Sequence, residues 1–374
     1  MQILIFVVLL SAFFTSFIAT LLMRRVALKY LFLDIPGGRK QHSHPIPLGG
    51  GIAVAIGVGL PILCGVLVAY IHRNTNYFNF LPDGIVRHTG GVLTRLPQLL
   101  IIFLGGCVIL LLGLIDDKKG LSPWFKLLVE TIVAVGLALG GIKLSVFMGG
   151  ETGYVVSVVL TVLWVLVITN AFNLLDHMDG VCSGVVAVVC ISFLIIAIMI
   201  GEHFISLLVA AILGSVLSFL IFNTHPAKIF LGDAGSLFVG YILSALTIVF
   251  TFYNADYLLY SYFVPIIVLA VPLFDTLMVV LIRLKSGRSI FEGDRNHLAH
   301  RLLGLGMSVR GAVLVVYVLT LCTGLSAILL YQVRAVGASI ILLQVILILI
   351  IVTLLETKGR NKINAEEGQK ANNG

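Results

Sequence analysis

Residues 2–23 read QILIFVVLLSAFFTSFIATLLM, and Arg24 and Arg25 follow directly. A helix that crosses the hydrocarbon core of a bilayer needs about 20 consecutive, mostly apolar residues. No basic segment precedes this run, and it is longer than the apolar part of a secretion signal. The stretch therefore predicts a first transmembrane helix that is retained in the protein, with the arginine pair at its membrane boundary.

The composition of the whole chain agrees with a membrane environment. Of the 374 residues, 59% are hydrophobic and only 11% are charged, whereas soluble domains carry about 25% charged residues. Helices are the default in a membrane because each buried peptide group must be bonded within its own segment. The sequence predicts an all-α, polytopic integral membrane protein with about eleven transmembrane helices, and a polar, disordered tail in residues 357–374. The predicted spans lie near residues 2–23, 48–71, 98–115, 125–142, 154–172, 181–200, 203–222, 235–252, 257–282, 309–331 and 335–355.

Basic residues decide the orientation of these spans, because cytoplasmic loops carry an excess of Lys and Arg. The loops after the first, third, fifth, seventh and ninth spans, together with the tail, hold all but five of the 24 Lys and Arg residues. The N-terminus is thus predicted outside and the tail in the cytoplasm, and the net charge of +7 mostly reflects this topology. No basic domain stands apart from the spans, which argues against nucleic-acid binding. The five basic residues on the other side are Arg73, Arg87, Arg95, Lys143 and Arg334.

Two neighbouring carboxylates, Asp116 and Asp117, close the third predicted span. Acids at a span end are costly unless they face water, a cation or a base, and adjacent acids repel each other unless a metal or another cation lies near both. Lys126 follows nine residues after Asp117 and is expected to return to the same site from the next helix. The alternative is a plain helix end, neutralised by Lys118 and Lys119.

Amides and acids recur at three-residue spacing in the segment Asn170-Ala-Phe-Asn173-Leu-Leu-Asp176-His-Met-Asp179. On a helix, this spacing places positions 170, 173 and 176–177 on one face. Such a polar stripe must face a wet cavity or a ligand, and its oxygen atoms suit Mg²⁺. A helix C-cap with solvated acids is the alternative, although four hydrogen-bonding residues in ten exceed the needs of a cap.

A further acid, Asp233, stands between Phe230 and Ser236 in the segment Phe-Leu-Gly-Asp-Ala-Gly-Ser. The pattern predicts a ligand-binding loop ahead of a helix N-terminus, where the helix dipole stabilises an acid. The alternative is that Asp233 only caps that helix.

The first predicted cytoplasmic loop carries Arg39, Lys40 and His42 among prolines and glycines. These side chains offer hydrogen-bond donors to a phosphate group. The alternative is a positive-inside anchor with no ligand.

The last predicted cytoplasmic loop carries His297, His300 and Arg301, which are spaced to share one helical face. Two histidines at this spacing can bind zinc, but the flanking arginines favour an anion. None of the five cysteines forms a Cys-x-x-Cys pair that would support zinc. Asp275 lies within the ninth predicted span, where an acid is either functional or paired with a buried donor.

Taken in order, these loops resemble those of the polyprenyl-phosphate N-acetylhexosamine-1-phosphate transferases, and the resemblance covers residues 1–356. The first loop is similar to that of the N-acetylglucosamine branch, because it has Arg-Lys-x-His ahead of Pro and Gly-Gly. The Thr-Pro-Thr-Met-Gly-Gly run of the peptidoglycan branch is absent from the sequence. The other motifs, in family order, are Asp116-Asp117 with Lys126 downstream, Asn170 to Gly180, Phe230 to Ser236, and Asp294 to Arg301.

The resemblance implies an enzyme of the bacterial cytoplasmic membrane that depends on Mg²⁺ or Mn²⁺ and has one catalytic transmembrane domain, residues 1–356. Asp233 would hold the metal, with Asn173 the next candidate, while Asp116 and Asp117 would prepare the lipid phosphate or organise the metal. Phe230 would stack on uracil. The remaining substrate contacts would come from Arg39, Lys40, His42, Lys126, Asn170, Asp176, Asp179, Asp294, Arg295, His297, His300 and Arg301.

Two positions depart from the family pattern. Ala299 stands where many members have a further histidine, so no role for that histidine carries over. His177 stands where glycine is common, and a non-glycine residue resists left-handed backbone geometry. Both departures bear on how the sugar fits the site.

The reaction implied is the transfer of N-acetylhexosamine 1-phosphate, in the first place N-acetylglucosamine 1-phosphate, from a UDP-sugar to undecaprenyl phosphate. UMP leaves, and the lipid-linked sugar starts a cell-envelope polysaccharide. The alternatives are a peptidoglycan-type transferase and, in another class, a lipid or solute transporter with binding groups near the midplane in repeated, broken helices. Self-association into a homodimer stays open.

Overall fold

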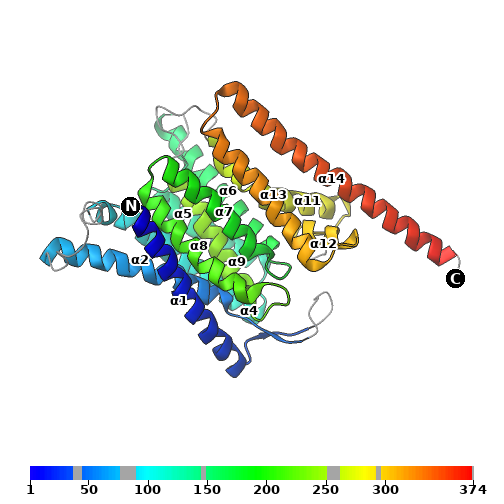
Figure 1. The fold of residues 1–374 in the computed structure, drawn as a ribbon, viewed down its shortest axis with the longest axis horizontal. Helices are drawn as coiled ribbons and strands as arrows, with labels where there is room; N and C mark the ends of the chain where they lie inside the picture. Colours follow the sequence, from blue (N-terminus) through cyan, green and yellow to red (C-terminus); the bar gives the residue numbers. More distant parts are fainter. Residues whose placement is uncertain (37–43, 76–89, 145–148, 251–261, 292–295, 373–374) are drawn as a thin grey trace. The chain divides into compact units, whose positions relative to one another are not determined.

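The computed structural model describes residues 1–36, 44–75, 90–144, 149–250, 262–291 and 296–372. Within these residues, nine helices are long and apolar enough to cross a membrane. The protein is therefore a polytopic membrane protein built from helices, as the sequence predicted (Figure 1). The chain divides into two compact units, Met1–Thr251 and Phe252–Gly374.

Among its described residues, the first unit has eight long helices and one short pair of strands. The strands β1 (Leu33–Asp34) and β2 (Ile46–Pro47) pair antiparallel, a small exception to the all-α prediction. They close the two ends of the first predicted cytoplasmic loop. The helices are α1 (Gln2–Lys29), α2 (Gly50–Thr75), α4 (Leu96–Lys119), α5 (Pro123–Leu139), α6 (Gly150–Leu175), α7 (Val181–Met199), α8 (His203–Asn223) and α9 (Gly232–Val249).

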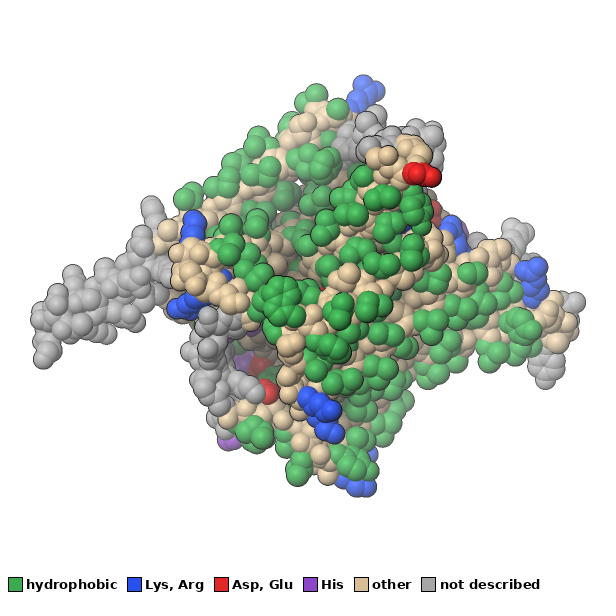
Figure 2. Space-filling model, turned by 180° about the vertical axis from the view of Figure 1, so that it is seen from behind, with side chains coloured by type: hydrophobic (Ala, Val, Ile, Leu, Met, Phe, Trp, Pro, Cys, Tyr) green, Lys and Arg blue, Asp and Glu red, His purple; other side chains and the backbone are tan. Residues whose placement is uncertain are grey.

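The helix α9 forms the centre of this unit, and α2, α4 and α6 pack against it. Every α9 residue from Ala234 to Thr247 is buried. The outer helices instead expose large apolar side chains, such as Leu104 at 66% and Ile132 at 62%. Figure 2 shows apolar side chains over most of the face it draws. Because such a surface is unfavourable in water but not in lipid, it supports a bilayer around these helices.

Glycines allow α2 and α4 to approach the N-terminal end of α9. A side chain on Gly113 of α4 would overlap the backbone of Ala234, and one on Gly51 of α2 would overlap the backbone of Gly235. Small residues at such crossings let helix backbones come close in a membrane. The close approach brings the acidic end of α4 directly against the first turn of α9.

The second unit contains α10 (Val264–Val268), α11 (Ala270–Lys285), α12 (Leu298–Gly304), α13 (Val309–Leu330) and α14 (Ala335–Asn372). Of the predicted spans, only the ones near 125–142 and 257–282 lack a helix of spanning length among the described residues. The first of these is α5, which has 17 residues. The second is interrupted at Leu269, between α10 and α11. The helix α14 continues into the tail for which the sequence predicted disorder.

Candidate functional site

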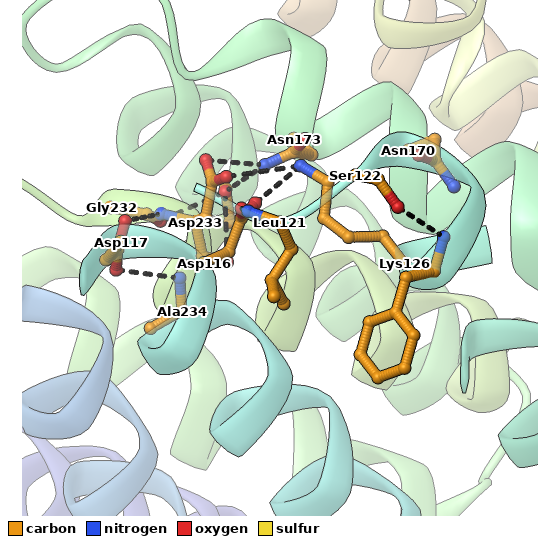
Figure 3. Close-up of polar contacts among 12 residues, drawn as sticks. Asp116, Asp117, Leu121, Ser122, Lys126, Asn170, Asn173, Gly232, Asp233 and Ala234 are labelled. Atoms are coloured by element: carbon orange, nitrogen blue, oxygen red, sulfur yellow. Dashed lines mark hydrogen bonds and ion pairs between the residues drawn. The ribbon is translucent and has the colours of Figure 1, made fainter. Parts of the chain in front are cut away.

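The polar residues of the first unit meet where four helix ends converge. The C-terminal ends of α4 and α6 lie beside the N-terminal ends of α5 and α9, as the sticks in Figure 3 show. The predicted motif residues Asp116, Asp117, Lys126, Asn173 and Asp233 are connected there by hydrogen bonds. Helix termini leave backbone groups unpaired, so their convergence favours a cluster of polar side chains at this point.

Asp117 caps the N-terminus of α9 from the neighbouring helix. Its Oδ1 accepts a hydrogen bond from the backbone N–H of Asp233 at 2.8 Å, and its Oδ2 accepts one from Ala234 at 3.2 Å. A carboxylate at this position is also stabilised by the helix dipole. The sequence placed Asp233 in a loop ahead of the helix, but α9 begins at Gly232, so Asp233 lies in its first turn. The cap considered for Asp233 is instead supplied by Asp117.

Asp116 and Asp233 share the ammonium group of Lys126. Lys126 Nζ lies 2.5 Å from Oδ2 of Asp116 and 3.4 Å from Oδ2 of Asp233. The other oxygen of Asp116 accepts the backbone N–H of Leu121 at 2.6 Å. The prediction that Lys126 returns to the acids from the next helix is confirmed. A positive charge thus stands between two carboxylates from different helices.

Asn173 connects α6 to the same acids. Its Nδ2 donates to Oδ1 of Asp233 and to Oγ of Ser236, both at 3.0 Å. Asn170 lies on α6 about one turn away and donates to Glu130 of α5. The two amides therefore follow one face of α6, as their spacing predicted.

Asp176 follows the last residue of α6 and forms its C-cap. Asp176 is half-buried. Burial raises the pKa of its carboxyl group well above the usual range, and the charges of Asp233, Asp117 and Asp179 raise it further. The next residue, His177, has no positive φ, so it does not need the left-handed geometry of a glycine. The acids crowded at this point favour a positively charged partner.

The loop between α6 and α7 and the loop between α8 and α9 are connected by hydrogen bonds beside these acids. Oδ2 of Asp179 accepts a hydrogen bond from Ala227 N at 3.1 Å and lies 2.8 Å from His225 Nδ1. Asn223 is buried and joins the same loops: its Oδ1 accepts from Gly180 N and Ser183 Oγ, and its Nδ2 donates to Ile229 O. These contacts fix the chain that leads into α9.

The backbone N–H and C=O of Phe230 are both hydrogen-bonded, one to β2 and one to the segment that follows β2. Phe230 N donates to Pro47 O at 2.9 Å, and Phe230 O accepts from Gly50 N at 3.0 Å. Gly51 N donates to Leu231 O at 2.9 Å. The half-buried Phe230 side chain, expected to stack on a base, therefore projects from a fixed backbone.

Comparison with known proteins identifies relatives along most of the chain. The family model described as "Glycosyl transferase family 4" matches residues 99–251, which include the converging acids of α4 and α9. A probable undecaprenyl-phosphate N-acetylglucosaminyl 1-phosphate transferase of Bacillus subtilis (strain 168) is 34% identical over 322 residues, covering 84% of this chain and 82% of the relative. The chain belongs to glycosyl transferase family 4.

Two further relatives carry similar names. The decaprenyl-phosphate N-acetylglucosaminephosphotransferase of Mycobacterium tuberculosis (strain ATCC 25618 / H37Rv) is 32% identical, over 82% of this chain and 78% of its own length. The undecaprenyl-phosphate alpha-N-acetylglucosaminyl 1-phosphate transferase of Yersinia pestis is 26% identical, over 78% of this chain and 75% of its own length. The resemblance read from the motifs is thus confirmed at the level of the family.

The second unit of this glycosyl transferase family 4 member contains a buried acid with several donors. Asp275 of α11 is 1% exposed. Its Oδ2 lies 2.9 Å from His297 Nδ1, and its Oδ1 accepts from Leu298 N at 2.6 Å and lies 3.8 Å from Arg301 Nη2. The expectation that Asp275 pairs with buried donors is confirmed. His297 is the N-cap of α12, so it precedes the helix on which it was predicted to share a face with His300 and Arg301.

Some predicted site residues lie outside the residues that the structure describes. They are Arg39, Lys40, His42, Asp294 and Arg295.

The structure also draws attention to two residues that received no role from the sequence. Asn223 ties two loops together, and its position at a span end was its only signal. Glu130 is 1% exposed on α5 and accepts a hydrogen bond from Asn170 at 2.5 Å. An acid on an apolar helix four residues after Lys126 was a usable signal, because buried acids in membrane proteins are costly and need a reason.

Proposed function

We propose that this protein transfers N-acetylglucosamine 1-phosphate from a UDP-sugar to a polyprenyl phosphate at the cytoplasmic face of a bacterial membrane. A lipid phosphate oxygen forms a bond to the β-phosphorus, and the bond from this phosphorus to the bridging oxygen breaks. UMP leaves with that oxygen, and a polyprenyl-diphosphate-sugar remains. The observation that carries the proposal is the cluster of Asp116, Lys126, Asn173 and Asp233 at the joined helix ends. The names of the relatives support the choice of sugar and lipid.

The cluster fits a divalent cation such as Mg²⁺ or Mn²⁺. Its donors are carboxylate and amide oxygens, the hard ligands that Mg²⁺ prefers. Four acids, Asp116, Asp117, Asp176 and Asp233, influence one another at this point, and Lys126 is paired with two of them. Asp233 is the first candidate ligand, because its side chain is 38% exposed and its oxygens lie among Asn173, Lys126 and the carboxyl group of Asp116. A bound cation would neutralise charge on the diphosphate.

The chain's own residues mainly bind and position anions in this reaction. A phosphate monoester has its second pKa near 6, so a lipid phosphate is already a nucleophile near pH 7 and needs little help from a base. Asp117 is fully engaged with two backbone N–H groups, so we assign it the positioning of α9 and Asp233. Lys126 supplies positive charge for the transferred phosphoryl group. His297, His300 and Arg301 are proposed contacts for the remaining phosphate or sugar.

The test is UMP release by the purified full-length protein from UDP-N-acetylglucosamine with a short polyprenyl phosphate. We expect release to require both the lipid phosphate and Mg²⁺, and to stop when the cation is chelated. UDP-N-acetylgalactosamine and the muramoyl-pentapeptide substrate of a peptidoglycan-type transferase serve as competing donors. Preference for the latter would replace the sugar assignment, and no UMP release from any donor would overturn the reaction and favour a transporter.

A further inference from the structure

Glu130 has an unusual hydrogen-bonding state for a buried acid. One carboxyl oxygen accepts a hydrogen bond from Nδ2 of Asn170. The other, Oε1, has no hydrogen-bond partner among the residues that the structure describes. A buried acceptor without a donor is unfavourable and needs an explanation in a native protein. A donor that approaches Glu130 in another state of the protein would satisfy this oxygen.

A second acceptor without a donor belongs to Asn170 itself. Both amide hydrogens of Asn170 are used, one toward Glu130 and one toward the carbonyl of Leu166 at 3.0 Å. Because both partners are acceptors, the amide nitrogen must face them, and the orientation of the amide is fixed. No described residue donates a hydrogen bond to the Oδ1 atom that remains. Glu130 and Asn170 therefore present two neighbouring acceptors that receive no hydrogen bond from the described residues, and of these only Oε1 of Glu130 is fully buried.

Lys126 is the donor within reach of this pair. It lies four residues before Glu130 on α5, a spacing that puts both side chains on one face, and the two charges interact. In this structure its ammonium group is held by Asp116 and Asp233 instead. An ammonium group has three donor hydrogens, enough to satisfy both empty acceptors.

We propose that Glu130 and Asn170 form a second binding position for the Lys126 ammonium group. Lys126 occupies this position when a divalent cation binds the carboxylates of Asp116 and Asp233. The inference rests on the proposed cation site. Two positive charges on the same pair of carboxylates repel each other strongly in a partly buried site. Moving the Lys126 ammonium group by one helical turn relieves this repulsion and keeps its charge beside the cluster. Glu130 is then a positioning residue for Lys126.

The test measures cation binding directly, by electron paramagnetic resonance titration of the purified full-length protein with Mn²⁺ and no substrate. We expect Glu130→Gln to weaken Mn²⁺ binding about tenfold, within the range of typical coupling between two sites. Lys126→Met should bind Mn²⁺ at least as tightly as the unchanged protein, because the competing ammonium group is gone. In the Lys126→Met background, Glu130→Gln should cause no further loss.

The outcomes distinguish a failure of the proposed cation site from a failure of the proposed second position for Lys126. Glu151→Gln, an exposed acid in the first turn of α6, is the matched control and should leave Mn²⁺ binding unchanged. If the unchanged protein binds no Mn²⁺, the cation site of the proposed function is refuted. If the unchanged protein binds Mn²⁺, but Glu130→Gln has no effect on binding or has an equal effect with and without Lys126→Met, the second binding position is refuted. Should Glu130→Gln not fold, Asn170→Leu removes the other acceptor and should also weaken binding only when Lys126 is present.

Discussion

Replacing Gly232 with alanine tests the link between Asp117 and α9 without removing a reactive group. Gly232 has a φ of +74°, and an added Cβ would lie 2.6 Å from Oδ2 of Asp117. A left-handed backbone costs a non-glycine residue about 1–2 kcal/mol. Displacing one oxygen of Asp117 from its backbone N–H loses a charged hydrogen bond worth about 1.5–3 kcal/mol. The free energy of unfolding should therefore fall by about 2.5–5 kcal/mol, and Asp233 should shift with the helix end.

Gly201 provides the matched control in the same unit. Its φ is +76°, but an added Cβ would meet nothing within 4 Å. Gly201→Ala should therefore lose only the backbone contribution of about 1–2 kcal/mol.

Both variants can be followed by unfolding in detergent and by UMP release. We expect Gly232→Ala to reduce UMP release at least about 100-fold, a loss typical of displaced electrostatic groups, and Gly201→Ala to change it little. Equal losses of stability in the two variants, or near-normal release by Gly232→Ala, would refute the role given to Asp117.

Three other predictions follow from the same site. Asp116→Asn and Asp233→Asn should each lower UMP release in a membrane assay at least about 100-fold at normal expression, whereas near-normal turnover in both would contradict the assignment. Asn223→Ala should lower the free energy of unfolding by about 2–4 kcal/mol, since it leaves several buried groups unpaired, and a change near zero would argue against its connecting role. Because burial raises the pKa of Asp176, the folded, cation-free protein holds a proton that the unfolded chain releases. The unfolding temperature of the protein should thus fall as the pH rises from the ordinary pKa of an aspartate toward the raised pKa of folded Asp176. In a chelator-containing buffer, Asp176→Asn should make the unfolding temperature depend less on pH.

The apolar runs of the sequence predicted the helices well because a bilayer imposes a length on each span. Two predicted spans, near 125–142 and 257–282, are not continuous helices of spanning length among the described residues. α5 is a shorter helix, with 17 residues from Pro123 to Leu139. The segment 257–282 contains Pro265 and Pro272, and proline is readily accommodated in the first turn of a helix, where its missing N–H is not needed. The two prolines lie in the first turns of the separate helices α10 and α11.

The sequence singled out the residues that meet at the helix ends, but it did not predict how they share their hydrogen bonds. These residues are Asp116, Asp117, Lys126, Asn173 and Asp233. Spacing alone placed Lys126 near the acids and Asn170 and Asn173 on one face. It could not distinguish Asp116, which binds Lys126, from Asp117, which caps α9. That difference depends on the close approach of α4 and α9 at a glycine, and two segments more than a hundred residues apart leave no local signal of it.

The short pairing of β1 with β2, described above, connects the chain that follows α1 to the chain that enters α9. Ile46 and Pro47 pair with β1, Pro47 O accepts from Phe230 N, and Gly50 N and Gly51 N donate to Phe230 O and Leu231 O. One backbone register is thereby shared by a segment near the beginning of the sequence and a segment near its middle, so a change that separates β1 from β2 should also displace the backbone of Phe230.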